Sequence, residues 1–127
     1  MSVFEQLVAF VPQGWVFIEL MFWLIAGHAV ADYALQNQYM SDSKSAVKPQ
    51  GIGIWKWVMF MHAMIHGAMV AYATGYIFIG MLEVASHFWI DHLKCTGRLG
   101  EGAKAHMRDQ ALHIGCKVIW AGIVVAL

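Results

Sequence analysis

Long apolar stretches alternate with short polar segments along this chain. A helix rises about 1.5 Å per residue, so crossing the hydrocarbon core of a bilayer takes about 20 mostly apolar residues. Four stretches are long enough, and they run from about Trp15 to Tyr39, Ile54 to Tyr72, Gly75 to Lys94 and Ala105 to Leu127. The pattern therefore predicts an all-α fold, an integral membrane four-helix bundle made of two transmembrane helical hairpins.

The segments between these stretches have the composition of helix-ending connections. The sequence SDSKSAVKPQGIG separates the first two stretches, CTGRLGEGA separates the last two, and a tight Ala73-Thr74 turn joins the middle pair. Ser, Pro and Gly in such runs end one helix and start the next. A short amphipathic N-terminal segment, closed by Pro12 and Gly14, precedes the first span. Without an internal repeat, we expect residues 1–127 to form a single transmembrane domain.

The composition also favours a membrane environment. Hydrophobic residues make up 60% of the chain and charged residues 13%, whereas charged residues make up about a quarter of an ordinary soluble domain. The formal net charge of zero offers no basic surface for a phosphate backbone, so we exclude nucleic acid as a partner. The two cysteines, Cys95 and Cys116, have no zinc-finger or CxxC spacing, and we expect them to be reduced thiols.

The basic residues predict how the chain is oriented, because Lys and Arg beside membrane spans stay preferentially in the cytoplasm. Of the eight basic residues, all but Lys117 flank the two longer loops. They are Lys44, Lys48, Lys56, Lys94, Arg98, Lys104 and Arg108. We therefore expect a multi-pass protein of the cytoplasmic membrane, with both ends outside and both longer loops in the cytoplasm (N-out/C-out).

Each predicted span carries ionisable residues four positions apart, which places them on one face of a helix. The sets are His28 and Asp32; His62 and His66; Glu83, His87 and Asp91; and Asp109 and His113. Counted from the predicted cytoplasmic ends, all four sets lie about 5–18 Å deep. The four spans therefore predict one shared polar layer in the cytoplasmic half of the membrane.

A cation accounts for this layer better than the available basic side chains do. An ionised carboxylate at the bilayer centre costs about 2.5–3.5 kcal/mol, and Lys94 and Lys117 can neutralise two carboxylates but not four. Imidazole and carboxylate are ligands for divalent metals, with zinc favoured here and iron or manganese as alternatives. The candidate metal ligands are His28, Asp32, His62, His66, His87, Asp91 and His113.

These ligands exceed the four of a tetrahedral site, so we expect either two metals, or one metal with an acid–base residue and supporting partners. A metal-free proton or ion relay and a purely structural polar network are the alternatives. We expect His92 and His106 to be peripheral, and Lys94 to be either a snorkelling terminal lysine or a contact to a substrate anion. Small residues on the spans permit close helix approach and favour a homo-oligomer.

The motifs HAVADYALQNQYM, HAMIH, EVASHFWIDHLK and RDQALHI resemble a known family. It consists of small inner-membrane proteins of bacteria and their phages and is catalogued as a domain of unknown function. The resemblance covers nearly the whole chain and implies a multi-pass protein of the bacterial inner membrane. A more distant similarity links the His/Asp helices to inner-membrane metal-dependent hydrolases. The resemblance implies the metal-site candidates given above together with Asp109, and it matches Glu83 to an acidic position one turn before His87.

The leading functional hypothesis is a metal-dependent hydrolase that acts on a lipid or a lipid-linked phosphate or ester at the cytoplasmic leaflet. The catalytic candidates are Glu83 or Asp109 as general base, with Lys94 or Arg108 holding a phosphate. One alternative is a di-iron membrane oxidoreductase. Another is a non-enzymatic phage or bacterial membrane factor, acting in envelope modification or superinfection exclusion, with a structural metal or polar network. Whether the chain is an enzyme stays open among these hypotheses.

Overall fold

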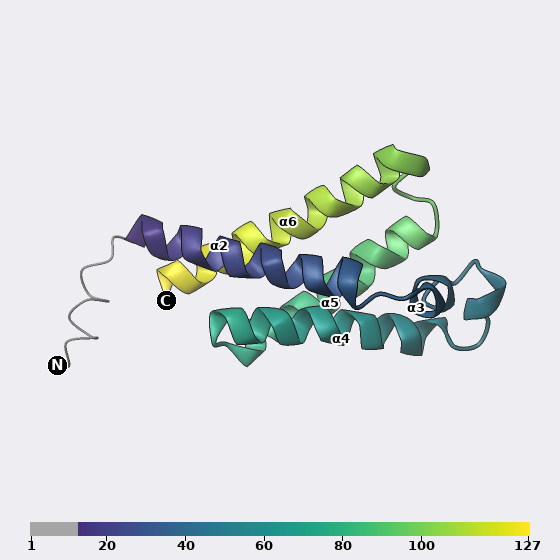
Figure 1. The fold of residues 1–127 in the computed structure, drawn as a ribbon, viewed down its shortest axis with the longest axis horizontal. Helices are drawn as coiled ribbons and strands as arrows, with labels where there is room; N and C mark the ends of the chain where they lie inside the picture. Colours follow the sequence, from purple (N-terminus) through teal and green to yellow (C-terminus); the bar gives the residue numbers. More distant parts are fainter. Residues whose placement is uncertain (1–12) are drawn as a thin grey trace.

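The computed structural model describes residues 13–127, and every regular element in that range is helical (Figure 1). The elements are α2 (Gln13–Ala29), the π-helical turn η1 (Val30–Ala34), α3 (Gln38–Ser43), the 3-10 turn η2 (Pro49–Gly51), α4 (Trp55–Thr74), α5 (Ile77–Cys95) and α6 (Gly102–Ala126). The all-α prediction is confirmed. The predicted amphipathic N-terminal segment lies outside the described residues.

The four long helices form two pairs. Helix α4 packs along α5, and α2 and α6 contact each other and this hairpin. Figure 1 shows the start of α2, the α4–α5 turn and the C-terminus at one end of the molecule, with α3 and the α5–α6 connection at the other. The two longer polar loops therefore share one end, as the two-hairpin prediction requires.

The first predicted span is shorter than the sequence pattern suggested. It ends with η1 at Ala34 rather than near Tyr39, and Tyr39 lies in the separate helix α3. The Asn37 side chain caps α3 by accepting a hydrogen bond from the Met40 backbone N–H. Asn at this position satisfies a backbone donor at the start of a helix, which explains why a new helix begins here.

Two described helices, Gly14–Ala34 and Gly102–Ala126, are long and apolar enough to cross a membrane by length and composition. Helices α4 and α5, with 20 and 19 residues, are not among the candidate spans by this measure. Length and composition thus support two of the four predicted membrane spans. The other two, over α4 and α5, stay a prediction.

The interior is divided into two layers along the helix axes. A small apolar core fills the layer near the termini, and its buried residues are Leu24, Val70, Ile79, Trp120 and Ala121. The next turns of the same helices, toward the polar loops, bury His, Asp and Glu side chains instead. The apolar layer thus closes the bundle on one side of the polar layer.

Two glycines let α4 and α5 approach closely beside these layers. A Cβ atom at Gly80 would lie 2.6 Å from the Gly67 carbonyl oxygen and 2.8 Å from the Ala71 Cβ. Distances below about 3 Å are overlaps, and the first of these neighbours is backbone, which cannot rotate away. The glycines therefore set the distance between the two helices that carry five of the buried His, Asp and Glu side chains.

We predict that Gly80→Ala lowers the free energy of unfolding by about 1–3 kcal/mol, because the added methyl group forces two packed backbones apart. Thermal unfolding of the purified protein, followed by circular dichroism, measures the effect. Gly115→Ala is the matched control, since nothing lies within 4 Å of a Cβ at this α6 position. There the better helix propensity of Ala should leave stability unchanged or raise it by up to about 1 kcal/mol. Equal melting temperatures for the two variants would contradict the close-packing account.

Candidate metal centre

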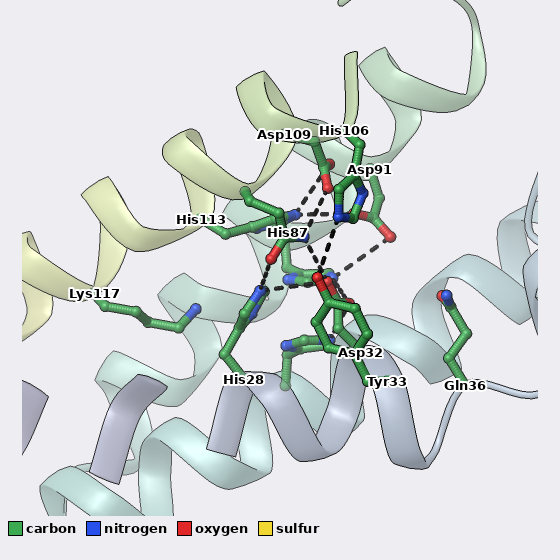
Figure 2. Close-up of polar contacts among 12 residues, drawn as sticks. His28, Asp32, Tyr33, Gln36, His87, Asp91, His106, Asp109, His113 and Lys117 are labelled. Carbon is green, nitrogen blue, oxygen red and sulfur yellow. Dashed lines mark hydrogen bonds and ion pairs between the residues drawn. The ribbon is translucent and has the colours of Figure 1, made fainter. Parts of the chain in front are cut away.

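Ionisable side chains from α2, η1, α4, α5 and α6 converge on one point inside the bundle (Figure 2). Five histidines and three aspartates form this inner cluster: His28, Asp32, His62, His66, His87, Asp91, Asp109 and His113. All except Asp32, which is partly exposed, are buried. The structure thus brings together the seven residues predicted as metal ligands. Asp109, which was predicted as a general base, lies in the same cluster.

The first group of donors surrounds the Asp32 carboxylate. Its Oδ1 atom lies 3.0 Å from His66 Nε2 and 3.4 Å from His62 Nε2. His87 Nε2 lies 4.0 Å from the same oxygen and 3.2 Å from His62 Nε2. The four donor atoms lie within 4.8 Å of one another. Three imidazole nitrogens and one carboxylate oxygen form a donor set suited to a divalent transition metal.

A second group lies on the α5–α6 side. His113 Nε2 is 3.0 Å from Asp91 Oδ1 and 3.3 Å from Asp109 Oδ1. These three donors also lie within 4.8 Å of one another. The Asp109 Oδ1 atom is buried and has no hydrogen-bond partner among the described residues. This group therefore also has the charge and spacing to hold a metal ion.

Asp91 faces both groups. Its Oδ2 atom lies 3.3 Å from His62 Nε2 and 3.5 Å from His87 Nε2 in the first group. Its Oδ1 atom faces His113 in the second group. A carboxylate with one oxygen toward each of two donor groups has the position of a bridging ligand.

The protonation states of the cluster fit a cation better than they fit a closed hydrogen-bond network. Carboxylate oxygens only accept hydrogen bonds, and a neutral imidazole has a single N–H. All five imidazoles direct Nε2 inward, and their buried Nδ1 atoms form no hydrogen bond within the described chain, although His87 Nδ1 lies 3.4 Å from Glu83 Oε1. The Nε2 atoms of His62 and His87 lie 3.2 Å apart, so a hydrogen bond between two neutral rings requires one of these nitrogens to carry no proton. A cation can instead take the lone pairs of both nitrogens and neutralise the inner carboxylates.

Lysines compensate three of the four carboxylates. Lys44 Nζ lies 2.5 Å from Asp91 Oδ2, and Lys117 Nζ lies 2.5 Å from Glu83 Oε1. Lys94 Nζ lies 3.3 Å from Asp109 Oδ2. The fourth carboxylate, Asp32, has no lysine or arginine partner within the described range 13–127. The first donor group is therefore where positive charge is most needed.

The three predicted catalytic residues take different positions around the cluster. Glu83 lies one turn outside it. Its Oε1 accepts a hydrogen bond from Lys117 Nζ, and its Oε2 accepts one from Trp120 Nε1 at 2.6 Å. Oε1 also lies 3.4 Å from His87 Nδ1. That is the position of a carboxylate that orients a metal-binding histidine. Asp109 belongs to the inner cluster. Lys94 lies at its rim, where its side chain is 36% exposed.

Two polar residues at the cluster were not predicted as site residues. Lys44 was interpreted as a residue of the first longer loop, but it is buried and donates to both Asp91 Oδ2 and the side-chain oxygen Oε1 of Gln36. The Gln110 side chain is shared by two residues, since its oxygen lies 3.0 Å from His28 Nε2 and its nitrogen donates to Asp32 Oδ2 at 2.9 Å. Gln110 could have been identified from its position next to Asp109 in the sequence. No sequence feature pointed to Lys44.

The two histidines expected to be peripheral differ from each other. His92 lies outside the cluster, with its ring stacked on Trp55 at a centroid distance of 4.8 Å. His106 lies at the rim, where its Nε2 is 3.2 Å from the Tyr33 hydroxyl and its Nδ1 is 3.4 Å from Lys94 Nζ (Figure 2). His106 therefore connects an exposed tyrosine with the lysine that contacts Asp109.

The π-helical turn η1 places Asp32. Its backbone closes with a hydrogen bond from the Leu35 N–H to the Val30 carbonyl oxygen at 2.9 Å, one residue wider than an α-helical turn. Such wide turns are uncommon and occur frequently at functional sites. Here the turn carries the one carboxylate that contacts histidines of both α2 and α4.

The fold and the cluster define a class: a helical protein whose buried histidines and carboxylates can hold metal ions. Residues 20–127 match the family described as "Protein of unknown function (DUF3307)", and the chain belongs to that family. No curated protein matches the chain significantly. No solved structure does so either. The family description names no activity, so a functional argument has to start from the cluster.

We predict that Lys117→Met destabilises the fold by about 3–5 kcal/mol, because it leaves the Glu83 carboxylate buried without its cation. Glu83→Gln combined with Lys117→Met should recover most of this loss, since the neutral pair needs no compensation. Chemical unfolding of the purified protein measures both effects. Val118→Met is the control, because Val118 is 46% exposed, and it should change stability by less than about 0.5 kcal/mol. A Lys117→Met variant as stable as the control would show that the pair contributes nothing.

Proposed function

We propose that the chain is a membrane-embedded hydrolase with a binuclear metal centre, acting on a lipid or a lipid-linked phosphate or ester at the cytoplasmic leaflet. The observation that carries the proposal is the inner cluster, in which Asp91 lies between two donor groups. Five imidazoles and three aspartates exceed what one tetrahedral metal uses. Two metals with a shared carboxylate account for the whole set.

The donor chemistry favours zinc, with manganese and iron as alternatives. Such a centre supplies a bound water of lowered pKa and polarises the bond to be cleaved. His62, His66, His87 and Asp32 would hold one ion, and His113 and Asp91 the other, with Asp109 beside them as the acid–base residue. His28 lies 3.3 Å from Asp32 Oδ2 and adds a further nitrogen donor on the α2 side.

Of the two predicted general bases, Asp109 is better placed than Glu83. Both Glu83 oxygens accept hydrogen bonds from Lys117 and Trp120, so neither is free to take a proton. Asp109 keeps Oδ1 without a hydrogen-bond donor in the described chain, and its Oδ2 accepts from Lys94. Asp109 can therefore accept a proton on one oxygen while Lys94 holds the other.

The distribution of polarity supports the membrane part of the proposal. Large apolar side chains face outward along the long helices, including Phe22 at 64% exposure, Trp89 at 61% and Ile119 at 55%. The ionisable side chains midway along α5 and α6 are buried, whereas Glu19 near the start of α2, and Lys104 and Arg108 near the start of α6, are exposed. Soluble monomers rarely expose apolar patches on this scale. Ionisable residues on membrane helices face the bundle interior, as they do here. A four-helix bundle in the bilayer is the arrangement that gives this exterior a fitting solvent.

A di-iron oxidoreductase is the second candidate, because a carboxylate between two histidine-rich donor groups suits that centre as well. The identity of the metal separates the two candidates. Zinc supports hydrolysis, whereas iron together with a requirement for an electron donor supports oxidation.

We predict about two divalent ions per chain in the purified protein, counted by inductively coupled plasma mass spectrometry. His66→Ala should lose about one of the two ions, because the first donor group loses one of its three histidines. His92→Ala is the control, since His92 stacks on Trp55 outside the cluster, and it should keep the wild-type content. A folded wild-type protein without stoichiometric metal would sink the proposal and favour a metal-free relay or a structural network.

Membrane topology offers a separate test. We predict that alkaline phosphatase fused after Leu127 is active and that the same enzyme inserted in the 41–53 loop is inactive, because the basic loops stay in the cytoplasm. Green fluorescent protein at the same sites should give the opposite pattern. A cytoplasmic signal from the C-terminal fusion would overturn the proposed orientation.

A further inference from the structure

A pocket of about 270 Å³ lies beside the metal centre, toward the polar loops. Lys44, Lys48 and Lys94 line it, together with Ser41 and Ser45. None of the described residues that line it is acidic. Three lysines and two serines around a small volume are suited to an anion with several oxygen acceptors.

Two of these lysines connect the pocket directly to the metal ligands. Lys44 Nζ is 2.5 Å from Asp91 Oδ2, the oxygen that faces the first donor group. Lys94 Nζ is 3.3 Å from Asp109 Oδ2 in the second group. An anion held between these lysines therefore lies next to both donor groups.

The third lysine lies on the outer side of the pocket. The side chain of Lys48 is 49% exposed, and its Nζ donates to Asp42 Oδ1 at 2.5 Å. That hydrogen bond holds the pKa of the Asp42 carboxyl below its ordinary value. An exposed ion pair of this kind contributes little stability, so Lys48 can turn toward an incoming anion at low cost.

We propose that this pocket binds the phosphate group of the substrate, which makes the substrate class a phosphoester rather than a carboxylic ester. The proposal rests on the hydrolase function proposed above. The volume accommodates a phosphate head group, whereas whole drug-sized ligands occupy pockets of about 300–1,000 Å³. Phosphate on a lipid and phosphate on a soluble molecule share this chemistry.

The test is calorimetric titration of inorganic phosphate into the full chain purified in detergent. We expect saturable binding by the wild type and a loss of affinity of about tenfold in Lys48→Gln, which removes one charged hydrogen-bond donor. Lys48→Arg should restore most of the affinity. Lys56→Gln is the matched control, because Lys56 lies over the Trp55 ring at 5.8 Å and does not line the pocket. It should bind phosphate as the wild type does.

Metal content, measured on the same samples, separates this proposal from the one it rests on. The protein can bind stoichiometric metal and yet bind no phosphate, or bind phosphate with equal affinity in the wild type and Lys48→Gln. Either result overturns the phosphate pocket but not the metal centre. Phosphate binding that depends on Lys48 in a metal-free protein supports the pocket and overturns the hydrolase.

A second arm identifies the source of the phosphate. The protein is reconstituted into phosphatidylcholine vesicles that contain phosphatidic acid. The matched control vesicles contain diacylglycerol, which lacks the phosphate. If inorganic phosphate binds more weakly in the vesicles with phosphatidic acid but not in those with diacylglycerol, the result supports a lipid head group in the pocket. Equal binding in both vesicles, with the Lys48 dependence intact, supports the phosphate of a soluble compound.

Discussion

The burial of ionised groups is the constraint on which this structure depends. Four carboxylates and five imidazoles occupy one layer of a bundle that exposes many large apolar side chains. Removing a charge from water is costly unless a partner of opposite sign compensates it. Glu83, Asp91 and Asp109 each have a lysine, and only Asp32 relies on imidazoles and an amide. The position of that uncompensated carboxylate, among four histidines, is the strongest reason to place a cation there.

The lysines also divide the site into parts with different tasks. Lys117 lies on the side of the apolar core and fixes Glu83, which in turn lies behind His87. Lys44 and Lys94 lie on the loop side, where each contacts an inner carboxylate and lines the pocket. Positive charge is therefore fixed behind the cluster and accessible in front of it, an asymmetry that suits an anionic substrate approaching from the loops.

Much of the site could be predicted from the sequence, because a spacing of four residues places side chains on one helix face. That rule identified the histidines and acids that meet inside the bundle, and the basic loops indicated which end they are near. It could not identify Lys44, because nothing local shows that a lysine between Ser43 and Ser45 turns inward to Asp91. The predicted end of the first helix was wrong for a different reason. The wide turn at Val30–Ala34 leaves no mark on an apolar pattern, and the Asn37 cap is a local signal inside a stretch whose length alone was used to predict a span. The family match agrees with the resemblance seen in the motifs and adds no activity.

The apolar layer formed by Leu24, Val70, Ile79 and Trp120 affects the side from which the polar layer can be reached. It separates the polar layer from the end that carries the termini, whereas the lysine-lined pocket lies on the loop side. With the proposed function and orientation, reactants and products would enter and leave through that pocket on the cytoplasmic side. Protons released there are returned to the same compartment, and turnover would neither draw on nor dissipate a transmembrane gradient.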